Sequence, residues 1–222
     1  MRATTLTTFL KAALKLQSPP YAGIRAINNT LIATDGYKMV AYTPGEGFIQ
    51  GEGVIEPVNA KVLLAYEEET WVTQIRVADN AVEFDITFKS IDAPSGYALK
   101  PATIRLASFD ARKLYSEKAL LNLRPPKARL VAEEASVKTL RQFDTPDREK
   151  VVFDEQTATF RDAGDEDVYR YSARQVRDAL SVFPARAKVS VLFGAKNELV
   201  FEEYGLLYAV CPFVYRAEED SQ

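Results

Sequence analysis

Short blocks of apolar positions, at helical or alternating spacing, run along the chain, and each is long enough for one helix or strand. Residues 5–16 place apolar side chains on one face of a helix and Lys11 and Lys15 on the opposite face. This spacing predicts a short amphipathic helix. Further helices are predicted at residues 58–68, 108–123 and 172–183. Ser172 is suited to cap the last of these at its N-terminus.

Strands are predicted between the helices, in pairs that turn at short polar dipeptides. Runs rich in β-branched and aromatic residues flank Asn28-Asn29, Asp79-Asn80 and Lys196-Asn197. This is the pattern of a β-hairpin. The other strand-like runs are residues 128–143, 151–162 and 204–215.

The stretch LIATDGYKMVAYTP, residues 31–44, interrupts an apolar run with Asp35 and Gly36. Asp35 could be a catalytic carboxylate, a metal ligand or a turn residue. Because glycine accepts positive φ and aspartate hydrogen-bonds to its local backbone, the pair is suited to a tight turn between two strands. The pattern therefore favours the structural role.

The order of the elements repeats after a segment with two prolines and a glycine near residues 90–102, which indicates two tandem domains. Both helices of each half pack most simply on one face of its sheet, since a sheet needs one face covered and a helix one stripe buried. We therefore expect an α+β fold of antiparallel sheets with two short helices on one face. The first domain would span residues 1–95, a connector 96–103 and the second domain 104–222.

Composition narrows the possible chemistry. Of 222 residues, 47% are hydrophobic and 27% are charged, the balance of a soluble globular protein. The chain has no histidine and a single cysteine, Cys211, so it cannot form a Ser-His-Asp or Cys-His catalytic system or a Cys/His zinc site. Glycine-rich nucleotide-binding signatures are absent. We expect no metal and no cofactor.

Location is predicted from the same features. The apolar runs are too short to span a bilayer, and the first residues do not form a signal peptide. A single cysteine agrees with a reducing compartment. We expect a cytoplasmic protein that contacts no membrane.

The net charge of −3, from 28 basic and 31 acidic residues, argues against a general affinity for polyanions. Basic residues nonetheless gather on the outward faces of the predicted helices. They are Lys11, Lys15, Lys61, Arg112, Lys113, Arg174 and Arg177. On residue types alone, these are ordinary solvated side chains.

Three segments resemble the bacterial β sliding clamps. LIATDGYKMVAYTP is similar to their strand-turn-strand of the type TVATDGHRLAV, with Tyr37-Lys38 in place of His-Arg. FKSIDAPSGYALKP resembles their interdomain stretch, SKLVDGRFPDYRRVLP. The end of the chain resembles the clamp ending, with Cys211-Pro212-Phe213 in place of Met-Pro-Met. The similarity covers nearly the whole chain, as the second and third domains of a three-domain clamp.

The resemblance implies two tandem sliding-clamp domains and no enzymatic activity. Clamps are rings of six similar domains that encircle duplex DNA without reading its sequence, so a two-domain chain would form a homotrimer. The implied partners are double-stranded DNA, a replicative DNA polymerase and a clamp-loader ATPase, in the bacterial nucleoid or a phage-infected cell. The helices line the hole of such a ring, which would make the seven basic residues above DNA-binding.

The resemblance also implies an apolar pocket that takes short peptides from replication proteins. In clamps this pocket is formed by the turn, the interdomain segment and the C-terminal strand, and the residues carried over to this chain come from the turn and the C-terminal strand. Its residues would be Thr34, Gly36, Tyr37, Lys38, Met39, Val210, Cys211, Pro212 and Phe213. Cys211 and Phe213 in place of methionine should change its shape and peptide preference.

Two alternatives remain open. One is a carboxylate-dependent hydrolase such as a glycosidase, with a pair drawn from Asp35, Glu83, Asp85 and Glu203. The other is a clamp-like subunit of a heteromeric ring. The acidic groups at residues 67–69 and 165–167 could bind a divalent cation, but their spacing favours solvated loops and helix ends.

Overall fold

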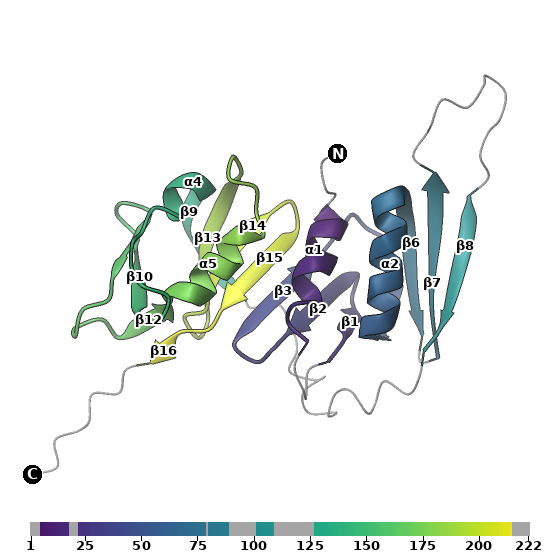
Figure 1. The fold of residues 1–222 in the computed structure, drawn as a ribbon, viewed down its shortest axis with the longest axis horizontal. Helices are drawn as coiled ribbons and strands as arrows, with labels where there is room; N and C mark the ends of the chain where they lie inside the picture. The colour runs from purple at the N-terminus through teal and green to yellow at the C-terminus, as the bar shows by residue number, and fades with distance from the viewer. Residues whose placement is uncertain (1–4, 18–21, 79, 89–100, 109–126, 215–222) are drawn as a thin grey trace, which may run out of the picture. The chain divides into compact units, whose positions relative to one another are not determined.

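The computed structural model describes residues 5–17, 22–78, 80–88, 101–108 and 127–214 (Figure 1). The chain divides into two compact units, Met1–Pro125 and Pro126–Gln222. The division falls later than the predicted connector at 96–103, because β8 (Ala102–Ala107) pairs with β7 (Ala81–Phe88) in the sheet of the first unit. Residues 96–100 lie outside the described residues, so the limits of the two domains stay a prediction.

The first unit combines two helices with two sheets. The helices are α1 (Thr5–Ala13) and α2 (Pro57–Glu69). One sheet has the order β5 (Gly53–Ile55), β1 (Ile24–Ile27), β2 (Thr30–Thr34), β3 (Lys38–Tyr42). The other has the order β4 (Ile49–Gly51), β6 (Thr70–Ala78), β7, β8. Neighbouring strands are antiparallel, except that β4 and β6 are parallel.

Local sequence explains these elements. Asn28 and Asn29 adopt positive φ angles of 48° and 57°, which a two-residue hairpin turn requires, and Ile27 pairs with Thr30 across it. Phe9 and Leu10 of α1 are fully buried where the helix packs on β2 and β3. The helices α1 and α2 contact each other and lie side by side over the strands (Figure 1), which confirms the predicted arrangement of helices on one face for the first unit.

The second unit is also built from two sheets. One has the order β15 (Leu206–Val210), β14 (Leu199–Glu203), β13 (Lys188–Gly194), β9 (Ala128–Ser136). The other has the order β11 (Thr159–Asp162), β10 (Lys150–Asp154), β12 (Tyr169–Ser172), β16 (Phe213–Val214). All of their pairs are antiparallel.

The described helices of the second unit are α4 (Val137–Leu140) and α5 (Ala173–Ser181). Ser172 caps α5 as predicted, since its hydroxyl accepts a hydrogen bond of 3.4 Å from the Gln175 amide. The predicted strand run at 128–143 is only partly correct: it ends at Ser136, whose hydroxyl accepts from the Thr139 amide and starts the short helix α4. The helix predicted at 108–123 lies outside the described residues. None of the described helices is long and apolar enough to cross a membrane.

Candidate nucleic-acid interface

The basic residues of the first unit lie on or directly after its two helices. Lys11 of α1 forms an ion pair with Glu68 of α2, at 2.6 Å between Nζ and Oε1. Lys15 follows the end of α1, Lys61 lies in α2, and both side chains are exposed. Within the described residues no carboxylate forms an ion pair with Lys15 or Lys61. These two ammonium groups are therefore available to an anionic ligand.

The two arginines of α5 have different surroundings. Arg174 is exposed and has no ion pair within the described part of the unit. Arg177 turns towards the loop that precedes β10. Its Nη1 lies 2.5 Å from Asp147 Oδ1, and its Nη2 donates to the carbonyl oxygens of Phe143, at 3.2 Å, and Thr145. Its guanidinium carbon lies 4.6 Å from the centre of the Phe143 ring. Arg177 therefore holds the helix and the loop together.

The other two predicted DNA-binding residues, Arg112 and Lys113, lie outside the described residues.

The turn between β2 and β3 is held by its own polar groups. Asp35 Oδ1 accepts hydrogen bonds from the amides of Tyr37, at 3.0 Å, and Lys38, at 2.8 Å. The Thr34 hydroxyl donates to the Lys38 carbonyl at 2.6 Å and accepts from the Gly36 amide at 3.0 Å. Gly36 has φ of 93°, where a side chain would be strained. Asp35 therefore has the structural role that the sequence favoured.

The predicted peptide-binding residues of the turn differ in exposure. Thr34 is buried and Met39 half-buried, whereas the Tyr37 side chain is 64% exposed. The Lys38 ammonium lies 3.6 Å from Asp35 Oδ2. The turn therefore exposes an aromatic ring to solvent, on a backbone held by the hydrogen bonds of Thr34 and Asp35.

The C-terminal segment of the second unit is held against β12. Val210 is fully buried at the end of β15, and Cys211 and Pro212 are half-buried. Phe213 begins β16, pairs in register with Arg170 and remains 42% exposed. The turn and this segment belong to different units, so the pocket predicted from both stays a prediction.

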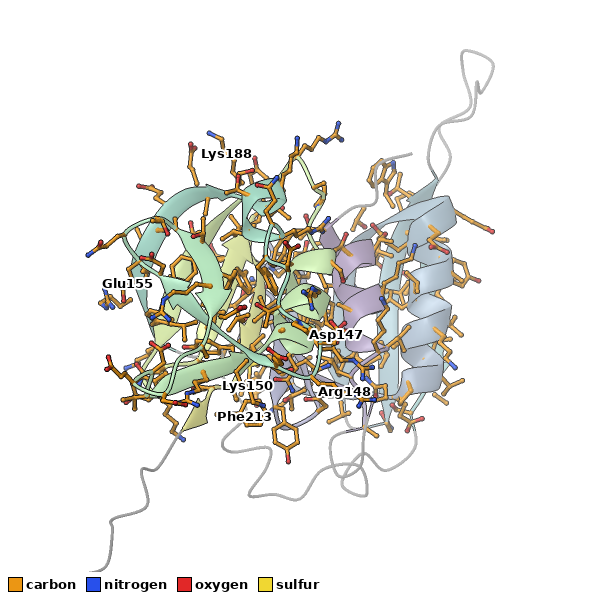
Figure 2. All side chains as sticks on the ribbon, turned by 60° about the vertical axis from the view of Figure 1, so that its left-hand side comes forward. Asp147, Arg148, Lys150, Glu155, Lys188 and Phe213 are labelled. Atoms are coloured by element: carbon orange, nitrogen blue, oxygen red, sulfur yellow. The ribbon has the colours of Figure 1, made fainter. Side chains whose placement is uncertain are left out.

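Lys150, which the sequence analysis did not associate with the C-terminal segment, lies over the ring of Phe213. The Nζ of Lys150 is 3.3 Å from the centre of the Phe213 ring, and Figure 2 shows the two side chains next to each other. This distance is well within the range of a cation–π interaction. The two residues are far apart in the sequence, so local pattern carried no signal for the contact.

The carboxylates considered for catalysis are largely engaged in ion pairs. Arg76 donates to both oxygens of Asp85, each at 2.8 Å, and lies 3.5 Å from Glu83. The hydrogen bonds from Arg76 and then Thr103 lower the pKa of Asp85 to about 2. A carboxyl group with such a pKa stays ionised at neutral pH and cannot act as a general acid. Burial raises the pKa of Glu203, which lies in the second unit.

The second unit contains a cavity of about 350 Å³ with carboxylates in its lining. Its lining includes Glu155 and Asp167. Glu155 Oε1 is 3.3 Å from Arg129, and Asp167 accepts two hydrogen bonds from Arg161, at 2.7 and 2.8 Å. The bond from Arg161 lowers the pKa of Asp167. These pairs are typical of structural salt bridges rather than of an acid and base pair.

The acidic groups considered as cation ligands also have local partners. Glu67 is buried and accepts from the Val72 amide at 2.8 Å, while Glu68 pairs with Lys11. Asp167 accepts from the Gly164 amide in addition to Arg161. Over the described ranges, no group of three or more Asp, Glu, Cys or His residues could hold a metal ion.

Solved structures match the fold of this chain, although no family model and no curated protein matches its sequence. The DNA polymerase III β subunit of Borrelia burgdorferi has a TM-score of 0.52 and 12% identity, covering 97% of this chain and 62% of that chain. The β subunit of Thermotoga maritima has a TM-score of 0.52 and the sliding clamp of Caulobacter crescentus 0.51, each at 12% identity and covering 97% of this chain and 65% of that chain. The chain has the sliding-clamp fold. It spans less than two thirds of the length of these clamps.

Proposed function

We propose that this protein is a DNA sliding clamp, a non-enzymatic ring that encircles duplex DNA and tethers replication proteins to it. The observation that carries the proposal is the clamp fold over 97% of the chain. The replicative polymerase and the clamp-loader ATPase are the proposed partners, in the cytoplasm.

The exposed basic residues of the helices support a contact with the DNA backbone. Lys15, Lys61 and Arg174 extend from three helical segments without an ion pair among the described residues. Contacts to phosphates position a protein on DNA but carry no base information, which permits sliding. We retain Lys11, Arg112 and Lys113 as further contacts. Arg177 is assigned first to the stability of its unit, because the loop residues occupy its guanidinium.

A homotrimer follows from the proposal, since three copies of a two-unit chain supply six clamp units. Among the described residues, β8 of the first unit and β11 of the second are edge strands of their sheets. Pairing of edges between subunits would remove exposed edges and close the ring.

Partner proteins would bind through the turn at residues 34–39 and the segment at 210–213. The exposed rings of Tyr37 and Phe213 support this assignment, because aromatic side chains supply much of the binding energy in peptide-binding sites. The rest of the proposed pocket consists of Thr34, Gly36, Lys38, Met39, Val210, Cys211 and Pro212.

The experiment that tests the ring is the absolute mass in solution, measured by light scattering across a dilution series. A homotrimer has three times the mass of the 24.8 kDa chain. A mass that remains at 24.8 kDa at every concentration would contradict the homotrimer and favour a ring with different subunits.

A further inference from the structure

The turn between β14 and β15 holds a tyrosine where the backbone favours asparagine or glycine. Glu203 pairs with Leu206 across the turn, so its two residues are Tyr204 and Gly205. Their φ angles are 49° and 75°. A positive φ is strained for a bulky aromatic residue, and a two-residue hairpin turn prefers asparagine at this place. The turn itself therefore does not account for the tyrosine.

The packing of the second unit does not account for it either. The Tyr204 side chain is 87% exposed, and among the described residues it forms no hydrogen bond and contacts no other ring. Backbone strain that serves neither a turn nor a core indicates a functional position. Tyrosine is also one of the residues that contribute most to binding at protein interfaces. The exposed ring is therefore suited to bind a partner.

Two carboxylates next to the ring lack a cationic partner. Glu202 and Glu203 directly precede Tyr204 and are half-buried. Neither forms an ion pair or a side-chain hydrogen bond among the described residues, and burial raises the pKa of Glu203. Lys188 of the neighbouring strand β13 is held by Glu134 at 2.8 Å. A cation brought by a partner would therefore meet an aromatic ring and a carboxylate without an ion pair.

We propose that Tyr204 is a docking point for a second protein, whose arginine or lysine side chain packs on the ring and pairs with Glu202 or Glu203. A small cation does not fit, because the ring projects into solvent and a small ligand needs a concave site. Duplex DNA does not fit, because its phosphates would lie beside two carboxylates that have no ion pair. The partner is therefore a protein with a basic hollow that encloses the turn.

The docking point is separate from the segment at residues 210–213. The strand β15 leads from Leu206, next to the turn, to Val210, and at about 3.3 Å per residue these two ends are about 13 Å apart. A protein bound at Tyr204 thus contacts the opposite end of β15 and leaves the C-terminal segment accessible. The inference does not depend on the peptide-binding function proposed for that segment.

Exchanging the residues of two turns tests whether Tyr204 serves the fold. Asn28 is the exposed first residue of the hairpin turn in the first unit, with φ of 48°. Tyr204→Asn should raise the urea midpoint of its unit by about 0.3 M, because it relieves backbone strain, and Asn28→Tyr should lower that of the other unit by a similar amount. A lower midpoint for Tyr204→Asn would overturn the inference, because the ring would then serve the fold.

The chemistry of the partner is tested with a phage-displayed library of disulfide-closed heptapeptides, selected on the immobilised full chain. We expect a class of clones whose affinity falls about tenfold with Tyr204→Asn. These clones should carry Arg or Lys and should lose a similar factor when Glu202→Gln and Glu203→Gln are combined, because both the ring and a carboxylate bind the cation. Glu166→Gln is the matched control, since Glu166 is an exposed carboxylate elsewhere in the unit, and it should leave their affinity unchanged.

Several results would contradict the inference. The absence of any clone that depends on Tyr204 would do so, as would dependent clones without Arg or Lys, or clones that bind equally well after both glutamates are changed. A smaller mass of Tyr204→Asn in light scattering would assign the turn to a contact between copies of this chain. A loss of duplex DNA binding in the same variant would assign it to DNA. The clamp function is tested separately, because these selections use no DNA.

Discussion

The two units share an architecture but use the basic residues of their helices differently. In the first unit, Lys15 and Lys61 extend into solvent and have no ion pair among the described residues, whereas Lys11 pairs with Glu68. In the second unit, arginines hold α5 in place: Arg177 is bound by the loop before β10, and Arg141 binds the carbonyls at the end of the helix. A basic residue on a helix exterior can therefore stabilise the fold or bind a ligand, and the contacts that it makes decide between the two roles.

The largest effect on stability is expected at Arg141. Its Nη2 donates to the carbonyl oxygens of Leu180, at 2.6 Å, and Phe183, at 2.7 Å, which satisfies acceptors that a helix end leaves open. Arg141→Met should lower the free energy of unfolding by about 2–3 kcal/mol, since it leaves carbonyls without a charged donor. Urea denaturation followed by circular dichroism measures this.

Arg186→Met is the control for Arg141→Met, because Arg186 is exposed on the segment between α5 and β13. It should change stability by less than about 0.5 kcal/mol. Equal effects of the two variants would mean that Arg141 does not hold the helix end.

The next prediction concerns Arg177 and Arg174 of α5, whose substitutions should affect different properties of the protein, stability in one case and DNA binding in the other. Arg177→Met should destabilise the protein by about 1–2 kcal/mol, because it breaks a half-buried network with Asp147 and two carbonyls. It should leave the salt dependence of DNA binding unchanged. Arg174→Met should have the opposite profile, with unaltered stability and a slope of log K against log salt smaller by about 0.9 for each phosphate that the variant no longer neutralises.

A double-mutant cycle sharpens the assignment of Arg177. Combining Arg177→Met with Asp147→Asn should cost less than the sum of the two single changes, because both remove the same ion pair. Strict additivity, together with a reduced salt slope in Arg177→Met, would place Arg177 on the DNA instead.

The smallest expected effect is a dependence of the stability of the first unit on pH. The pKa of Asp85 is lowered to about 2 by Arg76 and Thr103, from a reference value of 3.8. The ionised carboxylate therefore stabilises the folded unit above about pH 4, and this contribution is lost as the pH falls from about 4 to 2. The stability difference between the protein and Asp85→Asn should be constant above about pH 5 and shrink over that window.

Trp71 is the single tryptophan of the chain and lies in β6, the strand of Arg76, so its fluorescence reports the unfolding of this unit. Asp144→Asn, a change of an exposed carboxylate in the other unit, is the control and should follow the unaltered protein. A stability difference for Asp85→Asn that does not change between about pH 5 and pH 2 would show that the Arg76 pair contributes nothing.

Local pattern was sufficient for most elements of the fold. The period of apolar residues predicted α1, α2 and α5, and the polar dipeptides predicted the hairpins at Asn28-Asn29 and Lys196-Asn197. The short helix α4 was missed, because Val137 and Leu140 continue a strand-like run and the capping hydroxyl of Ser136 alone marks the change. The pairing of β8 with β7 was also missed, because local sequence does not indicate which other strand a given strand pairs with.

The candidate sites depended more on tertiary structure. The helical period placed Arg174 and Arg177 on one outward face, but it carried no information about the loop that crosses Arg177. The contact between Lys150 and Phe213 joins strands that are distant in the sequence. Asp35 was predictable, because its partners, the amides of Tyr37 and Lys38, lie within three residues.

The most direct test of the clamp is retention on DNA of different topology. The protein is assembled at high concentration on a closed circular plasmid, passed through a gel-filtration column in moderate salt, and measured in the DNA fraction before and after one restriction cut. A ring that encloses the duplex stays on the circle and is lost from the linear form, because it slides off the free ends. Equal retention on both forms, or loss from both, would contradict a protein that encircles DNA.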